Sequence, residues 1–283
     1  SGGLISAILL KIPGTPSSIA ATFDGAPMME KGEAFKALGV GIVFSFIGTL
    51  ISLVVLVFVA PTLADFALQF GPQEYFAVVV FSVALIATLS SKNYLRGLFS
   101  AVLGITLATV GIAPVDAIRR FTFGITSLNS GFSILVAMIG LFAVTEIVHT
   151  ASTIRIEGKT TILSVKRGKG FGFSIAEGLG QAWNCIRSAL IGVGIGILPG
   201  IGGGTSNILS YIVAKNRSKH PEKFGTGIID GVVASETANN ASIGGALVPL
   251  LTLGIPGDAV TAVMLGGFLI QGIQPGPLLF VSQ

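Results

Sequence analysis

The sequence predicts an all-α integral membrane protein, and three of its properties lead to this prediction. Charged residues make up 11% of the 283-residue chain and apolar residues 51%, whereas soluble domains carry about 25% charged residues. Seven windows longer than sixteen residues contain no Asp, Glu, Lys, Arg or His, and a helix needs about 20 apolar residues to cross the hydrocarbon core. The alternation of polar and apolar residues that is typical of outer-membrane strands is missing from these windows. We therefore expect a polytopic helical bundle.

The first half of the chain is expected to cross the membrane four times. Within residues 29–148, the apolar windows place spans at about 37–61, 72–90, 97–113 and 131–148. Lys and Arg are concentrated in segments 29–36, 92–96 and 149–187, which the positive-inside rule assigns to the cytoplasm. The net charge of +4 is therefore explained by short cytoplasmic loops, and no single basic patch indicates nucleic acid.

Residues 188–214 are expected to form a re-entrant hairpin. The segment is apolar but is interrupted by a stretch rich in proline and glycine, residues 198–204, and the basic loop 215–225 follows it. A single crossing would leave that basic loop outside the cell, whereas a hairpin returns it to the cytoplasm. A complete crossing with an exception to the charge rule remains the alternative.

Two short segments that lie 243 residues apart match each other. Ile12-Pro13-Gly14 aligns with Ile255-Pro256-Gly257, and an apolar half-helix precedes each of them. We therefore expect residues 1–28 and 226–283 to form corresponding broken helices of two inverted repeats. In secondary transporters, broken helices at corresponding positions of two repeats point to the substrate site.

The three breaks predict an arrangement that binds anions. Proline lacks an N–H and glycine tolerates unwound backbone, so each break frees polar groups that persist at membrane depth only against protein, water or solute. Helices are expected to begin after Thr15, at residues 205–207 and after Asp258, and a helix N-terminus attracts negative charge. The carbonyl groups that end the preceding half-helices suit Na⁺.

The candidate site residues come from these breaks and from the polar segment 234–242. Two interpretations of that segment stay open: an exposed loop with a helix N-cap at Ser242, or a segment that supplies ligands. Substrate binding is assigned to Pro13, Gly14, Thr15, Ser17, Ser18, Gly202, Gly203, Thr205, Ser206, Asn207, Asn239 and Asn240. A tentative Na⁺ site is assigned to Asp258, Ser17, Thr237 and Thr261, because a carboxylate at position 258 would repel an anionic substrate unless a cation intervened.

Motifs of soluble enzymes are missing from the sequence. The two histidines, His149 and His220, form no metal-binding pair, and neither a Gly-x-Ser-x-Gly element nor a phosphate loop occurs. We expect no enzyme, and no cofactor other than a coupling ion. An intramembrane enzyme that uses Ser242 and Glu236 is a weaker alternative, because no histidine lies near them in the sequence.

Several stretches distributed over the whole chain are similar to one protein family. They include Lys11-Ile12-Pro13-Gly14-Thr15-Pro16-Ser17-Ser18, Arg120-Phe121-Thr122-Phe123-Gly124, Gly196-Ile197-Leu198-Pro199-Gly200-Ile201-Gly202 and Ile255-Pro256-Gly257-Asp258. With these residues the chain resembles the large membrane subunit of the tripartite tricarboxylate transporters.

The resemblance implies a multi-pass protein of the bacterial inner membrane that imports tricarboxylates or related carboxylates by Na⁺-coupled secondary transport. Besides the lipid bilayer, it implies two protein partners: a small membrane subunit and a periplasmic solute-binding protein that delivers the substrate. The family's large subunit is longer, so we expect Ser1 and Gln283 to lie inside a longer protein in which each repeat continues. Transport is expected to move the broken-helix core against the spans 37–113. A passive carboxylate channel or facilitator is the alternative.

Overall fold

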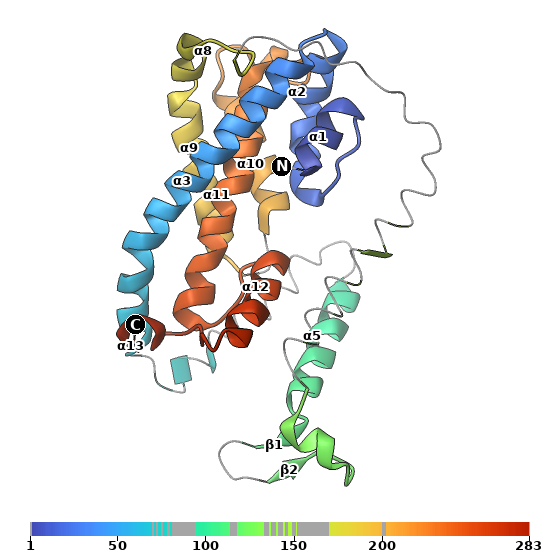
Figure 1. Ribbon diagram of the computed structural model, residues 1–283, viewed down its shortest axis with the longest axis vertical. Helices are drawn as coiled ribbons and strands as arrows, with labels where there is room; N and C mark the ends of the chain where they lie inside the picture. Colours follow the sequence, from blue (N-terminus) through green and yellow to red (C-terminus); the bar gives the residue numbers. More distant parts are fainter. Residues whose placement is uncertain are drawn as a thin grey trace.

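The computed structural model describes residues 2–69, 94–113, 118–132, 170–199 and 202–282, with isolated positions between 71 and 80 and between 136 and 151 (Figure 1). Its helices are α1 (Gly2–Leu9), α2 (Ile19–Glu30), α3 (Ala34–Ala67), α5 (Tyr94–Ala108), α8 (Ile175–Gly180), α9 (Ala182–Ile197), α10 (Gly202–Arg217), α11 (Ile229–Leu253), α12 (Ala259–Ile270) and α13 (Leu279–Ser282). The shorter elements are the 3-10 turns η1 (Pro16–Ser18), η2 (Thr126–Ser130) and η4 (Pro221–Lys223) and an antiparallel pair of strands, β1 (Gly111–Ile112) and β2 (Arg119–Arg120). The predominance of helices confirms the predicted all-α class.

Among the described residues, α3 is the one helix that is long and apolar enough to cross a membrane, with 34 residues. It contains the predicted span 37–61. The 15-residue α5 covers most of the predicted span 97–113 but ends at Ala108. It stops short because Gly111, with a φ of 124° that favours glycine, leads the chain into the pair of strands. The predicted spans 72–90 and 131–148 lie largely outside the described residues.

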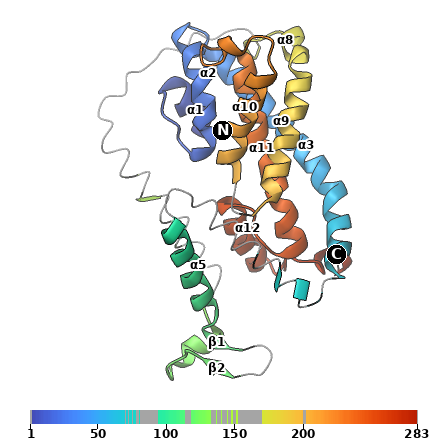
Figure 2. The ribbon, with the colours of Figure 1, turned by 180° about the vertical axis from the view of Figure 1, so that it is seen from behind.

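Helix α11 forms the centre of a bundle in which α3, α9 and α10 pack around it (Figures 1 and 2). Glycines allow the closest approaches. A Cβ atom on Gly48 of α3 would lie 2.5 Å from the carbonyl oxygen of Thr237, and one on Gly192 of α9 would lie 2.3 Å from that of Ala238. No larger residue fits at either contact, and such small-residue contacts are typical of helices that pack within membranes.

Helices α9 and α10 fold back on each other. Asn184, near the start of α9, donates a hydrogen bond to the carbonyl of Asp230 at 3.0 Å, and Gly196, near its end, packs against Ser242. Helix α10 begins beside the same Ser242 and reaches Gly231 with Tyr211 in its third turn. The outer ends of both helices therefore lie beside the start of α11, and the break between them lies half-way along it.

The structure changes three details of the predicted elements. Helix α11 runs without interruption through residues 234–242, so the interpretation of this segment as an exposed loop with an N-cap at Ser242 is wrong; its polar side chains lie inside the bundle. Helix α10 begins at Gly202 and not at 205–207, because Gly202 takes a left-handed φ of 65° that lets the chain turn directly into the helix. Helix α2 begins at Ile19, after the turn η1 rather than directly after Thr15.

Candidate functional site

The first turn of α10 lies where the chain breaks of both repeats meet α11. A Cβ atom on Gly203 would lie 2.7 Å from Asn239 Oδ1, 3.1 Å from Ser17 Oγ and 3.1 Å from Ser242 Oγ. A Cβ atom on the preceding Gly202 would lie 3.3 Å from the Cβ of Asp258. We call this group the central site: Ser17, Gly202, Gly203, Asn239, Ser242 and Asp258.

The two repeat breaks contain the same backbone hydrogen bond. The N–H of Ile12 donates to the carbonyl of Ser6 at 3.3 Å, and the N–H of Ile255 donates to the carbonyl of Pro249 at 3.2 Å. The preceding residue is left-handed in both copies, with a φ of 58° at Lys11 and 71° at Gly254. Each of these residues has its counterpart 243 positions later, so the shared geometry supports the predicted duplication.

The turn that follows each break is also built alike. Ser18 Oγ donates to the carbonyl of Thr15 at 2.9 Å and accepts from its N–H at 3.2 Å; Thr261 Oγ1 makes the same two bonds with Asp258, at 3.0 and 2.9 Å. In the second copy the Asp258 carboxylate also accepts from the N–H of Thr261 at 2.8 Å, so Asp258 is the N-cap of α12 as predicted. In the first copy the Thr15 hydroxyl only approaches Ser18 Oγ, at 3.5 Å.

Asn207 connects α10 with the first break. Its side chain is fully buried, and its Nδ2 donates to the carbonyl of Ser17. Its Oδ1 has no hydrogen-bond partner among the described residues. Next to it, the buried Ser206 hydroxyl donates to the carbonyls of Gly203 and Ala238, at 3.0 and 3.3 Å. Asn207 therefore offers a free acceptor oxygen beside the central site, whereas Ser206 ties α10 to α11.

The structure does not bring Thr237 and Asn240 into the central site. Thr237 lies two positions before Asn239, about 200° around the helix, and its hydroxyl points to Cys185 Sγ on α9 at 3.9 Å. Asn240 faces α3, where its Nδ2 donates to Ser45 Oγ at 2.8 Å. Neither the helical phase of α11 nor the helices that flank it could be obtained from residue types alone.

The remaining predicted residues line the breaks. Pro13, Gly14, Thr15 and Thr205 are exposed, whereas Ser18 and Thr261 are buried and use their hydroxyl groups in the turns described above. Gly14 packs against Gly3 of α1, and a Cβ atom there would lie 3.0 Å from the Gly3 Cα. In the second repeat, Gly257 packs against Ala246 in the same way, at 2.7 Å.

The contact between the buried carboxylate of Glu236 and α3 was not predicted from the sequence. Ser45 Oγ donates to Glu236 Oε2 at 2.9 Å. A signal existed in the sequence: Ser45, Gly48 and Ser52 recur at intervals of three and four in an otherwise apolar helix, and small residues with this spacing mark a helix–helix interface. That pattern predicts the interface but does not say which residue of another helix meets it.

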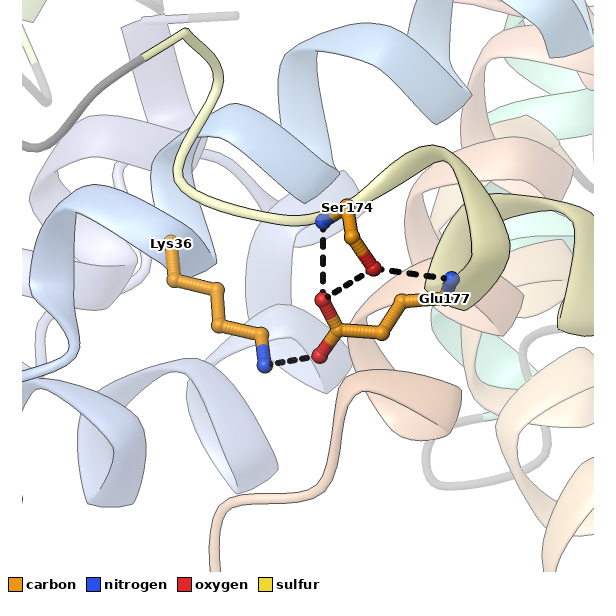
Figure 3. A network of polar contacts seen from close by, with 3 residues as sticks. All are labelled: Lys36, Ser174 and Glu177. Atoms are coloured by element: carbon orange, nitrogen blue, oxygen red, sulfur yellow. Dashed lines mark hydrogen bonds and ion pairs between the residues drawn. The ribbon is translucent and has the colours of Figure 1, made fainter.

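A network of polar contacts joins α8 to the start of α3 (Figure 3). Glu177 accepts from Lys36 Nζ at 2.5 Å and from the N–H and hydroxyl of Ser174 at 2.8 and 2.9 Å. Ser174 Oγ in turn accepts from the N–H of Glu177 and so forms a capping box at the start of α8. The hydrogen bond from Lys36, followed by those from Ser174, lowers the pKa of Glu177 from 4.5 to about 2.

The central site offers binding groups of both signs. The N–H groups of Gly202, Gly203 and the next residue in the first turn of α10 have no acceptor within the helix, and with the helix dipole they favour an anion. The Asp258 carboxylate and the Ser17 hydroxyl supply oxygen atoms that favour a cation. The geometry therefore suits an anion and a cation bound side by side.

Comparison with known proteins gives two matching relatives, both from Agrobacterium vitis. The protein described as "Uncharacterized 52.8 kDa protein in TAR-I ttuC' 3'region" is 38% identical over 282 residues, which are 100% of this chain and 55% of that protein. The "Uncharacterized protein in TAR-II ttuC' 3'region" is 49% identical over 89 residues, 31% of this chain and 37% of that protein. The chain thus spans about half the length of the longer match. No solved structure matches it.

The family comparison covers the whole chain. The family model described as "Tripartite tricarboxylate transporter TctA family" matches residues 1–283. This match agrees with the paired broken helices and the absence of enzyme motifs from the sequence. The chain belongs to the TctA family of the tripartite tricarboxylate transporters, which is a family of transporters and not of enzymes.

Proposed function

We propose that this chain forms the translocation core of a tripartite secondary transporter that imports tricarboxylates or related carboxylates, driven by Na⁺. The observation that carries the proposal is the convergence of three chain breaks at the central site. Ser17 comes from the first repeat break, Asp258 from the second and Gly203 from the break between α9 and α10. Unwound backbone at membrane depth requires such partners or a bound solute.

The substrate carboxylates are proposed to bind at the start of α10. The helix has 16 residues and begins with three glycines, of which Gly202 and Gly203 are buried, so no side chain of these three residues covers its first N–H groups. The side-chain amide of Asn239 and the hydroxyl groups of Ser17 and Ser242 surround this turn. The Ser17 hydroxyl and the side-chain amide group of Asn239 can donate hydrogen bonds to a carboxylate and release it again more readily than a buried Lys or Arg, whereas the Ser242 hydroxyl already donates to the carbonyl of Asn239 at 2.7 Å.

The coupling Na⁺ is proposed to bind on the side of Asp258. The Asp258 side chain lies against Gly202 at the start of α10, the carbonyl oxygen of Ser17 accepts from Asn207, and Asn207 adds an acceptor oxygen without a partner among the described residues. The Thr261 hydroxyl holds Asp258 in place. Thr237 lies on the opposite side of α11 and is no longer part of the proposal.

The orientation in the membrane follows from which segments lie together. Contacts from Lys36 to Glu177, from Gly227 to Met28 and from Asn184 to Asp230 bring the basic segments 29–36 and 215–225 and the end of 149–187 to one end of the bundle. We propose that this end faces the cytoplasm of a bacterial inner membrane. Residues 188–214 then enter and leave the membrane on the same side, as a re-entrant hairpin.

The family assignment supports two protein partners. TctA proteins belong to a tripartite system, so a small membrane subunit is proposed to accompany this chain. A periplasmic solute-binding protein is proposed to deliver the carboxylate from the opposite side of the bilayer.

Uptake by proteoliposomes tests the proposed function. The complete transport system is reconstituted, and accumulation of labelled citrate is measured with and without an inward Na⁺ gradient and with and without the binding protein. We expect labelled citrate to accumulate above its external concentration only when the Na⁺ gradient and the binding protein are both present. Equilibration without accumulation would instead indicate a passive channel, and accumulation that needs neither would contradict the coupling.

A further inference from the structure

Glu236 is the largest acidic side chain buried inside the bundle. It lies near the middle of α11, and 1% of its surface is exposed. It belongs neither to the central site nor to the turns of the repeat breaks. Its position at the contact between α11 and α3 therefore needs an explanation of its own.

The hydrogen bonds of Glu236 are too few to stabilise an ionised carboxylate. Oε2 accepts one hydrogen bond, from Ser45 Oγ, and Ser45 Oγ itself accepts from Asn240 Nδ2. Oε1 is buried and has no partner among the described residues. An ionised carboxylate with one neutral hydrogen bond costs several kcal/mol in such a place, whereas a neutral carboxylic acid costs far less.

No basic side chain of the described residues pairs with Glu236. The titratable groups on the elements packed against α11 are engaged elsewhere or lie towards the ends of the bundle. Lys36 of α3 binds Glu177, Arg187 of α9 donates to Asn184, Cys185 of α9 meets Thr237, and Asp24 of α2 accepts from Tyr211 of α10. The groups towards the ends of their helices are Glu30 at the end of α2, Asp65 in the last turn of α3, Lys215 and Arg217 in the last turn of α10, Asp230 in the first turn of α11 and Asp258 at the start of α12.

The packing around Glu236 favours a proton over a metal cation as the neutralising ion. Thr237, the next residue, has its carbonyl against Gly48, where even a Cβ atom would come within 2.5 Å. Two turns further along α11, Gly244 touches Ser52, and a Cβ atom on Gly244 would lie 2.4 Å from the Ser52 hydroxyl. A Na⁺ ion needs several oxygen atoms around it and room between the helices, whereas a proton needs neither.

We infer that Glu236 is a proton-binding site of the transport cycle and is protonated while α3 and α11 are in contact. The inference rests on the proposed function and on the movement expected from the sequence, in which the broken-helix core, which includes α11, moves against the spans 37–113, the first of which lies in α3. When these helices separate, water reaches the carboxyl group, its O–H bond breaks, the electron pair stays on the carboxylate and the proton passes to water. Burying an ionised carboxylate would cost several kcal/mol, so α3 and α11 pack against each other again only after the carboxylate has taken up a proton, which links proton movement to the movement of the core.

The substitution Glu236→Gln tests this link, because it keeps a neutral side chain that accepts from Ser45 but cannot release a proton. Transport is measured in proteoliposomes that contain the complete system with equal Na⁺ on both sides and the membrane potential clamped. We expect Glu236→Gln to lose accumulation driven by an inward proton gradient while it still exchanges labelled for unlabelled substrate. The matched control is Glu222→Gln, the same change at an exposed loop residue with a side-chain exposure of 66%, which should retain both activities. Gradient-driven accumulation by Glu236→Gln equal to that of the unchanged protein would overturn the inference.

Infrared spectroscopy provides a second test that does not depend on transport. The unchanged protein at neutral pH should show the carbonyl band of a protonated carboxylic acid that is shielded from solvent, and Glu236→Gln should lack it. If the unchanged protein shows no such band, the proton assignment fails, whether or not the variant folds. Loss of ²²Na⁺ binding in Glu236→Gln with the band absent would overturn it in favour of a sodium site. Failure of the proposed function would instead appear as the absence of exchange in the unchanged protein.

Discussion

The hydroxyl of Tyr211 on α10 donates a hydrogen bond to Asp24 Oδ2 on α2 at 2.9 Å, although 187 residues separate the two. The other carboxylate oxygen, Oδ1, accepts from the N–H groups of Gly225, Gly227 and Ile228 at 2.8–3.1 Å. Asp24 is fully buried. One side chain of the first repeat thus holds both the end of the α9–α10 hairpin and the loop that leads into α11.

Replacement of Asp24 by Ala should destabilise the fold strongly. Three backbone N–H groups and the Tyr211 hydroxyl would lose their acceptor in the fully buried Asp24, at a cost of about 3 kcal/mol or more in the free energy of unfolding. Tyr211→Phe removes a single hydrogen bond and should cost about 1–2 kcal/mol. Unfolding in detergent, followed by circular dichroism, measures both. Equal stability of the two variants would show that the backbone N–H groups do not depend on Asp24.

The contact between Lys36 and Glu177 should depend on pH in a defined direction. The pKa of Glu177 falls from 4.5 to about 2 on folding, so the contact contributes its full stability above the unfolded value and loses it as the pH falls from about 5 towards 2. The unfolding temperature of Glu177→Gln should therefore lie below that of the unchanged protein at pH 7, and the difference should shrink below pH 5. A difference that stayed constant down to pH 3 would contradict the lowered pKa.

The re-entrant hairpin predicts that both of its flanks react from the same side of the membrane. Cys185 is the single cysteine and is buried, so a thiol reagent that cannot cross the bilayer meets little background reaction. Ser174→Cys and Lys219→Cys lie in exposed positions before α9 and after α10. We expect both to react in inside-out vesicles and neither in right-side-out vesicles. Reaction from opposite sides would support a complete crossing.

The sequence predicted local features well because they depend on single residues. A proline followed directly by a glycine removes a helical donor and allows unwound backbone, so the breaks at Pro13 and Pro256 and the N-cap at Asp258 could be placed from the sequence, although single prolines such as Pro61 and Pro249 lie inside helices. The class of the fold followed from the scarcity of charge. These properties need no knowledge of neighbouring helices.

Features that depend on helix packing could not be obtained from the sequence. Thr237 and Asn239 are both polar residues of one short segment, so the sequence does not separate them. In the structure Thr237 contacts α9, whereas Asn239 contacts the start of α10. Because of its polar residues, the segment 234–242 could be taken for an exposed loop from the sequence alone. In the structure it is helical, and α3, α9 and α10 provide partners for its side chains. Glu236 was missed as a contact of Ser45 because 191 residues separate them, and no local pattern indicates such a pair.

The central claim is that substrate binds at the first turn of α10, and the most direct test is to add a side chain at that turn. A methyl group on Gly203 would lie 2.7 Å from Asn239 Oδ1, whereas one on Gly194 of α9 would meet no atom within 4 Å. Alanine in place of glycine stabilises a helix by up to about 1 kcal/mol, so neither change should unfold the protein by itself. The measurement is the initial rate of labelled citrate uptake by the reconstituted transport system. We predict that Gly203→Ala abolishes most of the uptake while Gly194→Ala retains it, and equal uptake by the two variants would contradict the proposed site.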